Sequence, residues 1–258
     1  MLIFLYLAIT LKEERFKFIL SALKENGKVN YGELSENLDI SEDTVRRDIE
    51  YLHSNGLLWK VRGGAIPLNK NPLAFEDRTG YHSEEKETIA LKAQSMLKKG
   101  MTVFMDGGTT VCAVAEKFPL DSSFRVITNN MALLPILSRL KGVEVIVLGG
   151  IMDHNTETNV GTKTSEDVKQ YVADLYLMGT CAISVKFGIT AAVREDGAVK
   201  KAMLGSAKTK VVLCDSKKIG TVEPFTVCGL EEIDILVTEL PSDDVKLDEL
   251  RFQNIKLI

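Results

Sequence analysis

The sequence predicts a two-domain protein, with a small helical domain followed by a larger α/β domain that contains a mainly parallel sheet. Over residues 12–68, apolar residues recur mostly at helical spacing. From residue 100 onward, short apolar runs alternate with helical stretches, as in parallel sheets covered by helices. The length of 258 residues suits one large domain and one small one.

Composition narrows the class of protein. Net charge is only −4, so any binding to polyanions must come from a local patch rather than from the whole surface. The cysteines are widely spaced and form no C-x-x-C pair, and the histidines are isolated, so we expect no disulfide framework, metal site or cofactor. A reducing cytoplasm is the expected location. No G-x-S-x-G or cysteine–histidine arrangement indicates a catalytic nucleophile.

Residues 1–11 form a nearly unbroken apolar run, MLIFLYLAITL. A membrane-spanning helix needs about 20 apolar residues. A signal peptide needs basic residues before the run and a cleavage site after it, whereas acidic and basic residues follow here. We therefore expect no membrane association, and interpret the run either as an extension that packs on a neighbour or as a start assigned too far upstream.

Three helices are predicted in the first domain. Apolar residues at helical spacing precede Asn26-Gly27, and Leu34 and Leu38 lie four apart in a second, shorter helix. The third helix, residues 42–55, follows Ser41, which is a favourable N-cap. Residues 56–64 then predict a small β wing.

The third helix buries one stripe, formed by Val45, Ile49 and Leu52, and leaves its polar residues on other faces. Three short helices with a tight connection before the third are typical of a helix-turn-helix, whose last helix enters the major groove of DNA. An amphipathic helix with a solvated polar face is the alternative, because periodicity alone indicates packing better than DNA contact.

The residue motifs in this segment are more specific than its periodicity. Leu34-Ser35-Glu36-Asn37-Leu38, the S-x-x-T-V-R-R-D core at residues 41–48 and the Gly63-Gly64-Ala65 end closely resemble the DNA-binding domain of the DeoR family of bacterial transcription regulators. The resemblance implies that double-stranded operator DNA is a partner. It also implies the following DNA contacts: Ser41, Thr44, Arg46 and Arg47, with Lys60 and Arg62 in the wing. We expect Asp48 to orient one of the two helix arginines.

The second domain is predicted over residues 72–258, after a linker at residues 69–72. Its helices are expected at residues 84–99, from about 109 to 117, 130–140 and 198–208. Its strands are expected at residues 102–105, 124–127, 143–148, 172–178, 211–214 and 233–237.

Small polar clusters follow several of these strands. They are residues 106–110 (DGGTT), 128–130 (TNN), 149–150 (GG) and 215–218 (DSKK). In open α/β sheets ligands bind beyond the carboxyl ends of the strands, so these clusters suit a phosphate or sugar hydroxyls. Each cluster alone is equally typical of an ordinary turn, because Gly, Asn, Asp and Thr favour turns.

This half also resembles the DeoR family, in Glu85-Lys86, the four polar clusters, Gly161, Ala173-Asp174 and residues 199–203. The resemblance implies a fold similar to ribose-5-phosphate isomerase and CoA transferase, and a sensor for phosphorylated sugars or related metabolites. The implied effector pocket consists of Asp106, Gly108, Thr109, Thr110, Thr128, Asn129, Gly149, Gly150, Lys200, Asp215 and Lys218. The lysines would pair with the phosphate, and Asp106 would bind sugar hydroxyls or make a structural hydrogen bond.

Two segments depart from the family pattern. Residues 179–183 read GTCAI where the family usually has a G-A-D-G-I-type run, and residues 196–199 read DGAV where an E-A-E-V-type run is common. Both lie near the implied pocket, so we expect an atypical effector or weakened binding without a change of fold.

The sequence thus predicts a repressor of a sugar or related catabolic operon, released from DNA by a phosphorylated metabolite. One alternative is an isomerase-like enzyme that uses Asp106, Glu195, Asp215 and a lysine for proton transfer. The other is a DNA-binding protein whose large domain only oligomerises. A homo-oligomer is expected in either DNA-binding case, because a single near-neutral helix-turn-helix gathers few phosphate contacts.

Overall fold

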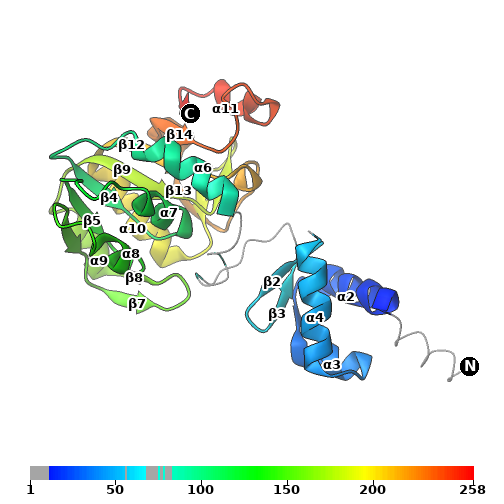
Figure 1. Cartoon of the computed structure of the whole chain (residues 1–258). Coiled ribbons are helices and arrows are strands. Elements are labelled where there is room, and N and C mark those ends of the chain that lie inside the picture. The colour runs from blue at the N-terminus through cyan, green and yellow to red at the C-terminus, as the bar shows by residue number, and fades with distance from the viewer. Residues whose placement is uncertain (1–11, 56, 68–74, 76–77, 79–82) are drawn as a thin grey trace, which may run out of the picture. The chain divides into compact units, whose positions relative to one another are not determined.

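The computed structural model of the chain describes residues 12–55, 57–67, 75, 78 and 83–258 (Figure 1). The apolar extension at residues 1–11 and the linker at residues 69–72 lie outside these residues. The chain divides into two compact units, Met1–Pro72 and Leu73–Ile258.

The first unit contains the predicted helices and wing. The helices are α2 (Lys12–Asn26), α3 (Tyr31–Leu38) and α4 (Glu42–Ser54). Three short antiparallel strands in the order β1-β3-β2 form the wing sheet: β1 (Val29–Asn30), β2 (Trp59–Val61) and β3 (Gly64–Ile66). The sequence did not predict β1, because two residues are too few to show alternation.

Caps and one apolar stripe position α4. The hydroxyl of Ser41 accepts a hydrogen bond from the backbone N–H of Thr44, as expected of an N-cap. Val45, Ile49 and Leu52 are completely buried and pack in one core with residues of α2 and α3. This packing fixes which side of α4 remains exposed.

The second unit is built on a parallel sheet that has seven strands in the described part of the chain. Its order is β15-β14-β12-β9-β4-β5-β6. The strands are β4 (Thr102–Met105), β5 (Arg125–Thr128), β6 (Glu144–Val147), β9 (Ala173–Gly179), β12 (Ala207–Leu213), β14 (Ile235–Val237) and β15 (Lys256–Leu257). The predicted α/β class is confirmed.

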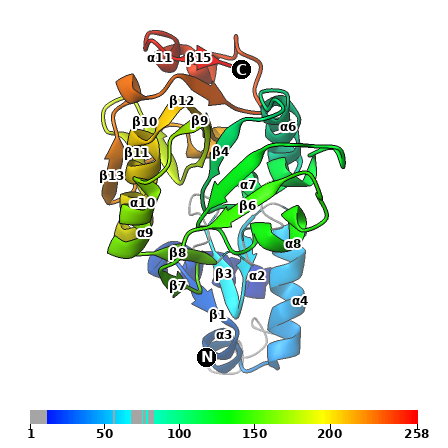
Figure 2. The ribbon, with the colours of Figure 1, turned by 90° about the vertical axis from the view of Figure 1, so that its left-hand side faces the viewer.

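Helices cover both faces of this sheet (Figure 2). One face packs against α6 (Ser83–Gln94), α7 (Thr109–Glu116) and α8 (Leu133–Leu137), and the other against α9 (Thr162–Val168) and α10 (Arg194–Gly205). Alternate residues of β4 divide accordingly, since Val103 and Met105 join one core and Phe104 joins the other.

Several elements differ from the prediction. Helix α6 ends at Gln94 rather than at residue 99, because the next amides bond three residues back and tighten the chain out of the α-helix. Helix α10 starts at Arg194, four residues before the predicted start at 198. Helix α9 was not predicted. Neither was the hairpin of β7 (Ile151–Asp153) with β8 (Thr158–Val160).

A small antiparallel sheet was also not predicted. It contains β10 (Ala182–Ser184), β11 (Gly188–Ala191) and β13 (Phe225–Cys228). The remaining elements are α11 (Asp248–Arg251) and three 3-10 turns at Ser216–Lys218, Leu230–Glu232 and Val245–Leu247. Strands this short carry too little periodicity to be read from sequence.

The strand order reverses direction at β4. From β4 the chain proceeds to β5 and β6 on one side, and then to β9, β12 and β14 on the other. Such a switch point leaves a crevice outside the carboxyl ends of the two strands that flank it, here β4 and β9. The fold therefore directs attention to the residues that follow Met105 and Met178.

Candidate functional site

Asp106 follows β4 at the switch point, is completely buried, and links the two central strands. Its Oδ1 accepts a hydrogen bond of 2.8 Å from the backbone N–H of Gly179 at the end of β9. Its Oδ2 accepts from the hydroxyl of Tyr176 at 2.6 Å and from the ammonium of Lys200 at 2.7 Å. Asp106 thus makes the structural hydrogen bonds that were one of its two predicted roles.

Lys200 comes from α10 and is only 2% exposed. Its ammonium also donates to the carbonyl of Gly179 at 2.9 Å and lies 3.5 Å from a carboxylate oxygen of Asp196. Burial alone would lower the pKa of Lys200, but Asp106 and Asp196 outweigh it and raise that pKa. Lys200 is therefore held as an ammonium by two carboxylates, and its predicted pairing with a phosphate stays a prediction.

Two glycines permit the close approach at this centre. A Cβ on Gly179 would lie 2.7 Å from the carbonyl oxygen of Gly107 and 3.3 Å from Asp106, so a side chain there would push the strand ends apart. Gly108 has a φ of +136°, a conformation that favours glycine, and it precedes α7 without a side-chain cap. The first amides of α7 are thus not satisfied by a capping side chain.

A second charged centre follows β12. Asp215 is completely buried, and the ammonium of Lys218 lies 3.0 Å from its Oδ2. Lys86, from the first turns of α6, is 5% exposed and donates to the backbone carbonyl of Arg78. Burial, together with the charges of Lys218 and Arg78, lowers the pKa of Lys86 to about 7.

Lys86 belongs to the Glu85-Lys86 motif that carries the family resemblance, but it was not predicted to line the pocket. Lys86 lies well before the first sheet strand in the sequence, so its position does not indicate that α6 brings it to the carboxyl end of β12. Tyr176 and Asp196 were also missed, because they lie inside a strand and a helix rather than in a polar cluster.

The residues after β5 connect it to the hairpin. The side-chain amide of Asn129 donates to the carbonyl of Asn159 at 2.9 Å, and that of Asn130 donates to the carbonyl of Asp106 at 3.0 Å. Thr128 is buried and accepts from the amide of Asn130. The Oδ1 of Asn129 is buried without a hydrogen-bond donor in the part of the chain described.

The other predicted pocket residues are placed as follows. Thr109 and Thr110 are buried in the first turn of α7. The carbonyl of Gly149 accepts from the hydroxyl of Thr164, and a Cβ on Gly150 would lie only 2.0 Å from that hydroxyl. Gly149 and Gly150 are therefore in contact with α9, on the β6 side of the switch point, while Asp215 and Lys218 lie on the β12 side.

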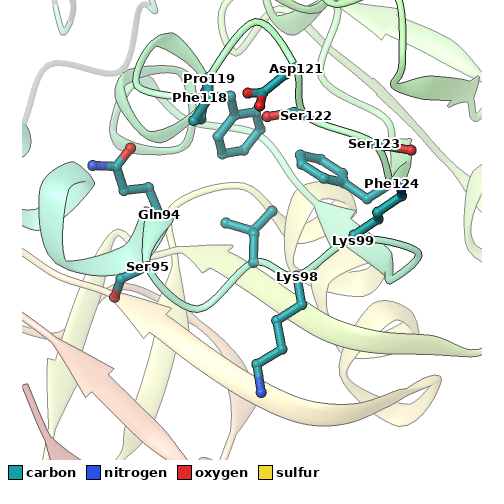
Figure 3. A pocket seen from close by; sticks show the side chains of 11 residues that line it. Gln94, Ser95, Lys98, Lys99, Phe118, Pro119, Asp121, Ser122, Ser123 and Phe124 are labelled. Carbon is teal, nitrogen blue, oxygen red and sulfur yellow. The ribbon is translucent and has the colours of Figure 1, made fainter.

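Two cavities differ in position. One, of about 340 Å³, is bounded by α6, α7 and α8 and is lined by Lys86, Thr109 and Cys112 among others. A second, of about 530 Å³, lies beside the amino ends of β4 and β5, where Phe118 and Phe124 form an edge-to-face pair (Figure 3). None of the predicted pocket residues line this second cavity.

The segment that departs from the family pattern lies beside the first centre. Cys181 is half-buried, and Ala182 begins β10, where it pairs with Thr190. The hydroxyl of Thr180 donates to the carbonyl of Ala182 at 3.2 Å. The substitutions leave the strand pairing intact, in agreement with the expected absence of an effect on the fold.

The predicted DNA contacts lie on and beside α4. Arg46 and Arg47 are exposed, and Arg46 is positioned by Glu42 at 3.5 Å and by the ring of Tyr31, whose centroid is 4.9 Å away. Ser41 and Thr44 share a hydrogen bond of 3.0 Å at the amino end of the helix. In the wing, Arg62 is exposed, and Lys60 pairs with Glu50 at 2.5 Å.

Asp48 differs from its expected role. It is buried and accepts two hydrogen bonds, of 2.6 and 3.0 Å, from the guanidinium of Arg15 on α2. Asp48 therefore joins α4 to α2 rather than orienting Arg46 or Arg47. The expectation was wrong because the helical repeat turns position 48 toward the core stripe, away from the exposed face.

No helix among the described residues is both long and apolar enough to cross a membrane. Within the same ranges, no three His, Cys, Asp or Glu side chains form a group that would hold a metal ion.

Comparison with protein families covers both units. A DeoR-like helix-turn-helix domain matches residues 15–71, and a DeoR C-terminal sensor domain matches residues 81–240. A winged helix-turn-helix joined to a sensor domain defines a DNA-binding transcription regulator. The chain belongs to the DeoR family.

Individual relatives are similar over almost their whole length. The HTH-type transcriptional repressor GlcR of Bacillus subtilis is 33% identical over 96% of each chain. The lactose phosphotransferase system repressor of Streptococcus mutans is 31% identical over 93% of this chain and 96% of its own, and the glycerol-3-phosphate regulon repressor of Escherichia coli is 26% identical over 95% and 97%. Among solved structures, ribose 5-phosphate isomerase A of Methanocaldococcus jannaschii has a TM-score of 0.38 at 14% identity, covering 52% of each chain.

Proposed function

We propose that the protein represses a sugar catabolic operon and that a phosphorylated sugar or related metabolite, bound at the carboxyl edge of the parallel sheet, sets its affinity for DNA. The observation that carries the proposal is the group of cations near Asp215, namely buried Lys86 and partly buried Lys218, in a unit joined to a winged helix-turn-helix. Relatives named as repressors of lactose transport and glycerol 3-phosphate regulons support the same reading.

The proposed site consists of the second charged centre and the neighbouring amino end of α7. A phosphate monoester would be attracted by Lys218 and Lys86 and by the uncapped amides after Gly108. In this proposal Asp106 and Lys200 hold the ends of β4 and β9 together, and Asn129 offers its Oδ1 to a sugar hydroxyl.

A homo-oligomer is part of the proposal. One helix-turn-helix makes too few phosphate contacts for tight binding, whereas two copies bind half-sites about one helical turn apart. Repressors of this kind act where the chromosome is, so we propose a cytoplasmic location.

Ligand binding is tested by thermal shift against a panel of sugar phosphates and their unphosphorylated parents, since a ligand of the folded state raises the melting temperature. A selective rise with one phosphate is expected. If no sugar phosphate raises the melting temperature or weakens DNA binding, the sensing part of the proposal fails.

The DNA-binding face is tested by Arg47→Ala and Arg46→Ala. Binding is measured by fluorescence anisotropy on duplexes that the wild-type protein selects from a random pool. Each variant should lose about 1–3 kcal/mol of binding free energy with little change in melting temperature, because both side chains are exposed. Lys24→Ala, at an exposed position of α2, is the control and should bind normally. Wild-type affinity in both arginine variants would refute the assignment.

A further inference from the structure

Three cations, Lys86, Lys218 and Arg78, lie near the carboxyl end of β12, where the charges of the last two act on Lys86. Lys218 pairs with Asp215 directly, while Lys86 is repelled by Lys218 and Arg78 and attracted by Asp215 and Glu85. Lys86 is almost completely buried, so water screens little of this repulsion. The cluster therefore has the composition of an anion site, in which the carboxylates of Asp215 and Glu85 balance only part of the charge of three cations.

Arg78 provides independent support for an anion site. Its Nε is buried and donates no hydrogen bond in the part of the chain that the structure describes. The charge of Arg78 acts both on Lys86 of α6 and on Cys112 of α7, and both of these residues line the 340 Å³ cavity. A buried guanidinium donor beside a cavity suits a phosphate oxygen.

Arg78 and Phe75 each make a backbone hydrogen bond with another residue of the sensor unit. The carbonyl of Arg78 accepts a hydrogen bond from Lys86. The backbone N–H of Phe75 donates to the carbonyl of Asn155, in the turn between β7 and β8, at 2.7 Å, and Phe75 packs against the same cavity. Both residues lie shortly after the boundary between the units at Leu73.

We infer that Arg78 and Lys86 bind the phosphate of the effector, so that a residue just after the unit boundary at Leu73 contacts the ligand. This inference rests on the proposed binding of a phosphorylated metabolite. A phosphate dianion would neutralise the repulsion among Arg78, Lys86 and Lys218 and give the Nε of Arg78 an acceptor. Ligand binding would then hold Phe75 and Arg78 more firmly on the sensor unit, which transmits occupancy toward the DNA-binding unit along the chain.

The test combines calorimetric titration of the full-length protein with amide hydrogen exchange, and inorganic phosphate is the probe. In the wild type, phosphate should slow exchange in the peptide that contains Phe75 and Arg78. Arg78→Met and Lys86→Met should each weaken phosphate binding by about tenfold or more and abolish that slowing. Arg78→Lys keeps the charge without the Nε donor and should recover part of the affinity.

Lys117→Met is the matched control. Lys117 lines the same cavity, but its ammonium is paired with Glu87 at 2.5 Å. This variant should bind phosphate like the wild type. Melting temperatures of all variants, measured without phosphate, show whether each one is folded.

The outcomes separate the inference from the proposed function. Equal phosphate binding by the wild type and Arg78→Met overturns the inference and leaves a phosphate-sensing regulator. If phosphate binding depends on Arg78 but does not slow amide hydrogen exchange at Phe75, the proposed transmission along the chain is overturned. A wild-type protein that binds neither phosphate nor any sugar phosphate overturns the inference and the sensing function together.

Discussion

Lys200 and Lys86 are both buried lysines of the sensor unit, at 2% and 5% exposure, yet their surroundings have opposite effects. Lys200 faces two carboxylates, which raise its pKa despite burial. For Lys86, burial and the charges of Lys218 and Arg78 outweigh the attraction of nearby carboxylates, and its pKa falls to about 7. Burial alone therefore does not define a binding site. The first centre is neutralised from within the protein, whereas we propose that an added anion stabilises the second.

The largest expected effect tests the first centre. Asp106→Ala would leave Lys200, Tyr176 and the amide of Gly179 without their shared acceptor in a buried position. Breaking a buried pair in this way costs about 3–5 kcal/mol, so chemical denaturation should show a loss of this size. Asp106→Ala is consequently a poor probe of ligand contact, because it would damage the fold first.

The control for that prediction is Asp167→Ala, which removes an exposed ion pair with Lys163 of 2.8 Å. An exposed pair contributes about 1 kcal/mol or less. If both variants lose the same stability, the Asp106 centre does not hold the ends of β4 and β9 together.

Much of this comparison could be predicted from the sequence, and part could not. Asp106 was placed at a strand end because a polar cluster follows a short apolar run, and the sheet confirms that position. Its contact with Lys200 was not predictable, since 94 residues separate the two and only the strand order brings them together. Lys86 was overlooked for a different reason, because a lysine in a first helical turn ordinarily indicates a solvated face.

The second centre predicts a stabilising substitution. The pKa of Lys86 is 10.5 in an unfolded chain and about 7 in the folded protein, so folding must displace a proton or hold an unfavourable charge. This penalty is complete below pH 7 and disappears as the pH rises through 10.5. At about 1.4 kcal/mol per pKa unit, Lys86→Met should gain up to about 5 kcal/mol at pH 6.

The gain should shrink to about 2 kcal/mol at pH 9, where the lysine is already neutral in the folded state but not in the unfolded one. Denaturant unfolding at the two pH values measures both quantities. A gain that does not depend on pH would mean that Lys86 is not held in an unfavourable charged state. That result would remove the contrast with Lys200.

The smallest effect on stability, and the sharpest on ligand binding, is expected at Lys218. Its side chain is 14% exposed and pairs with the buried Asp215, so Lys218→Ala should lose less stability than Asp106→Ala and remain folded, which its melting temperature checks. Loss of one charged hydrogen bond to a phosphate oxygen costs about 1.5–3 kcal/mol, which is at least tenfold in affinity.

Lys217→Ala removes an exposed neighbouring lysine and should change nothing. Calorimetric titration with the best sugar phosphate of the panel distinguishes the two variants. If they respond alike, the cations around Asp215 do not bind the effector, and the second centre is structural like the first.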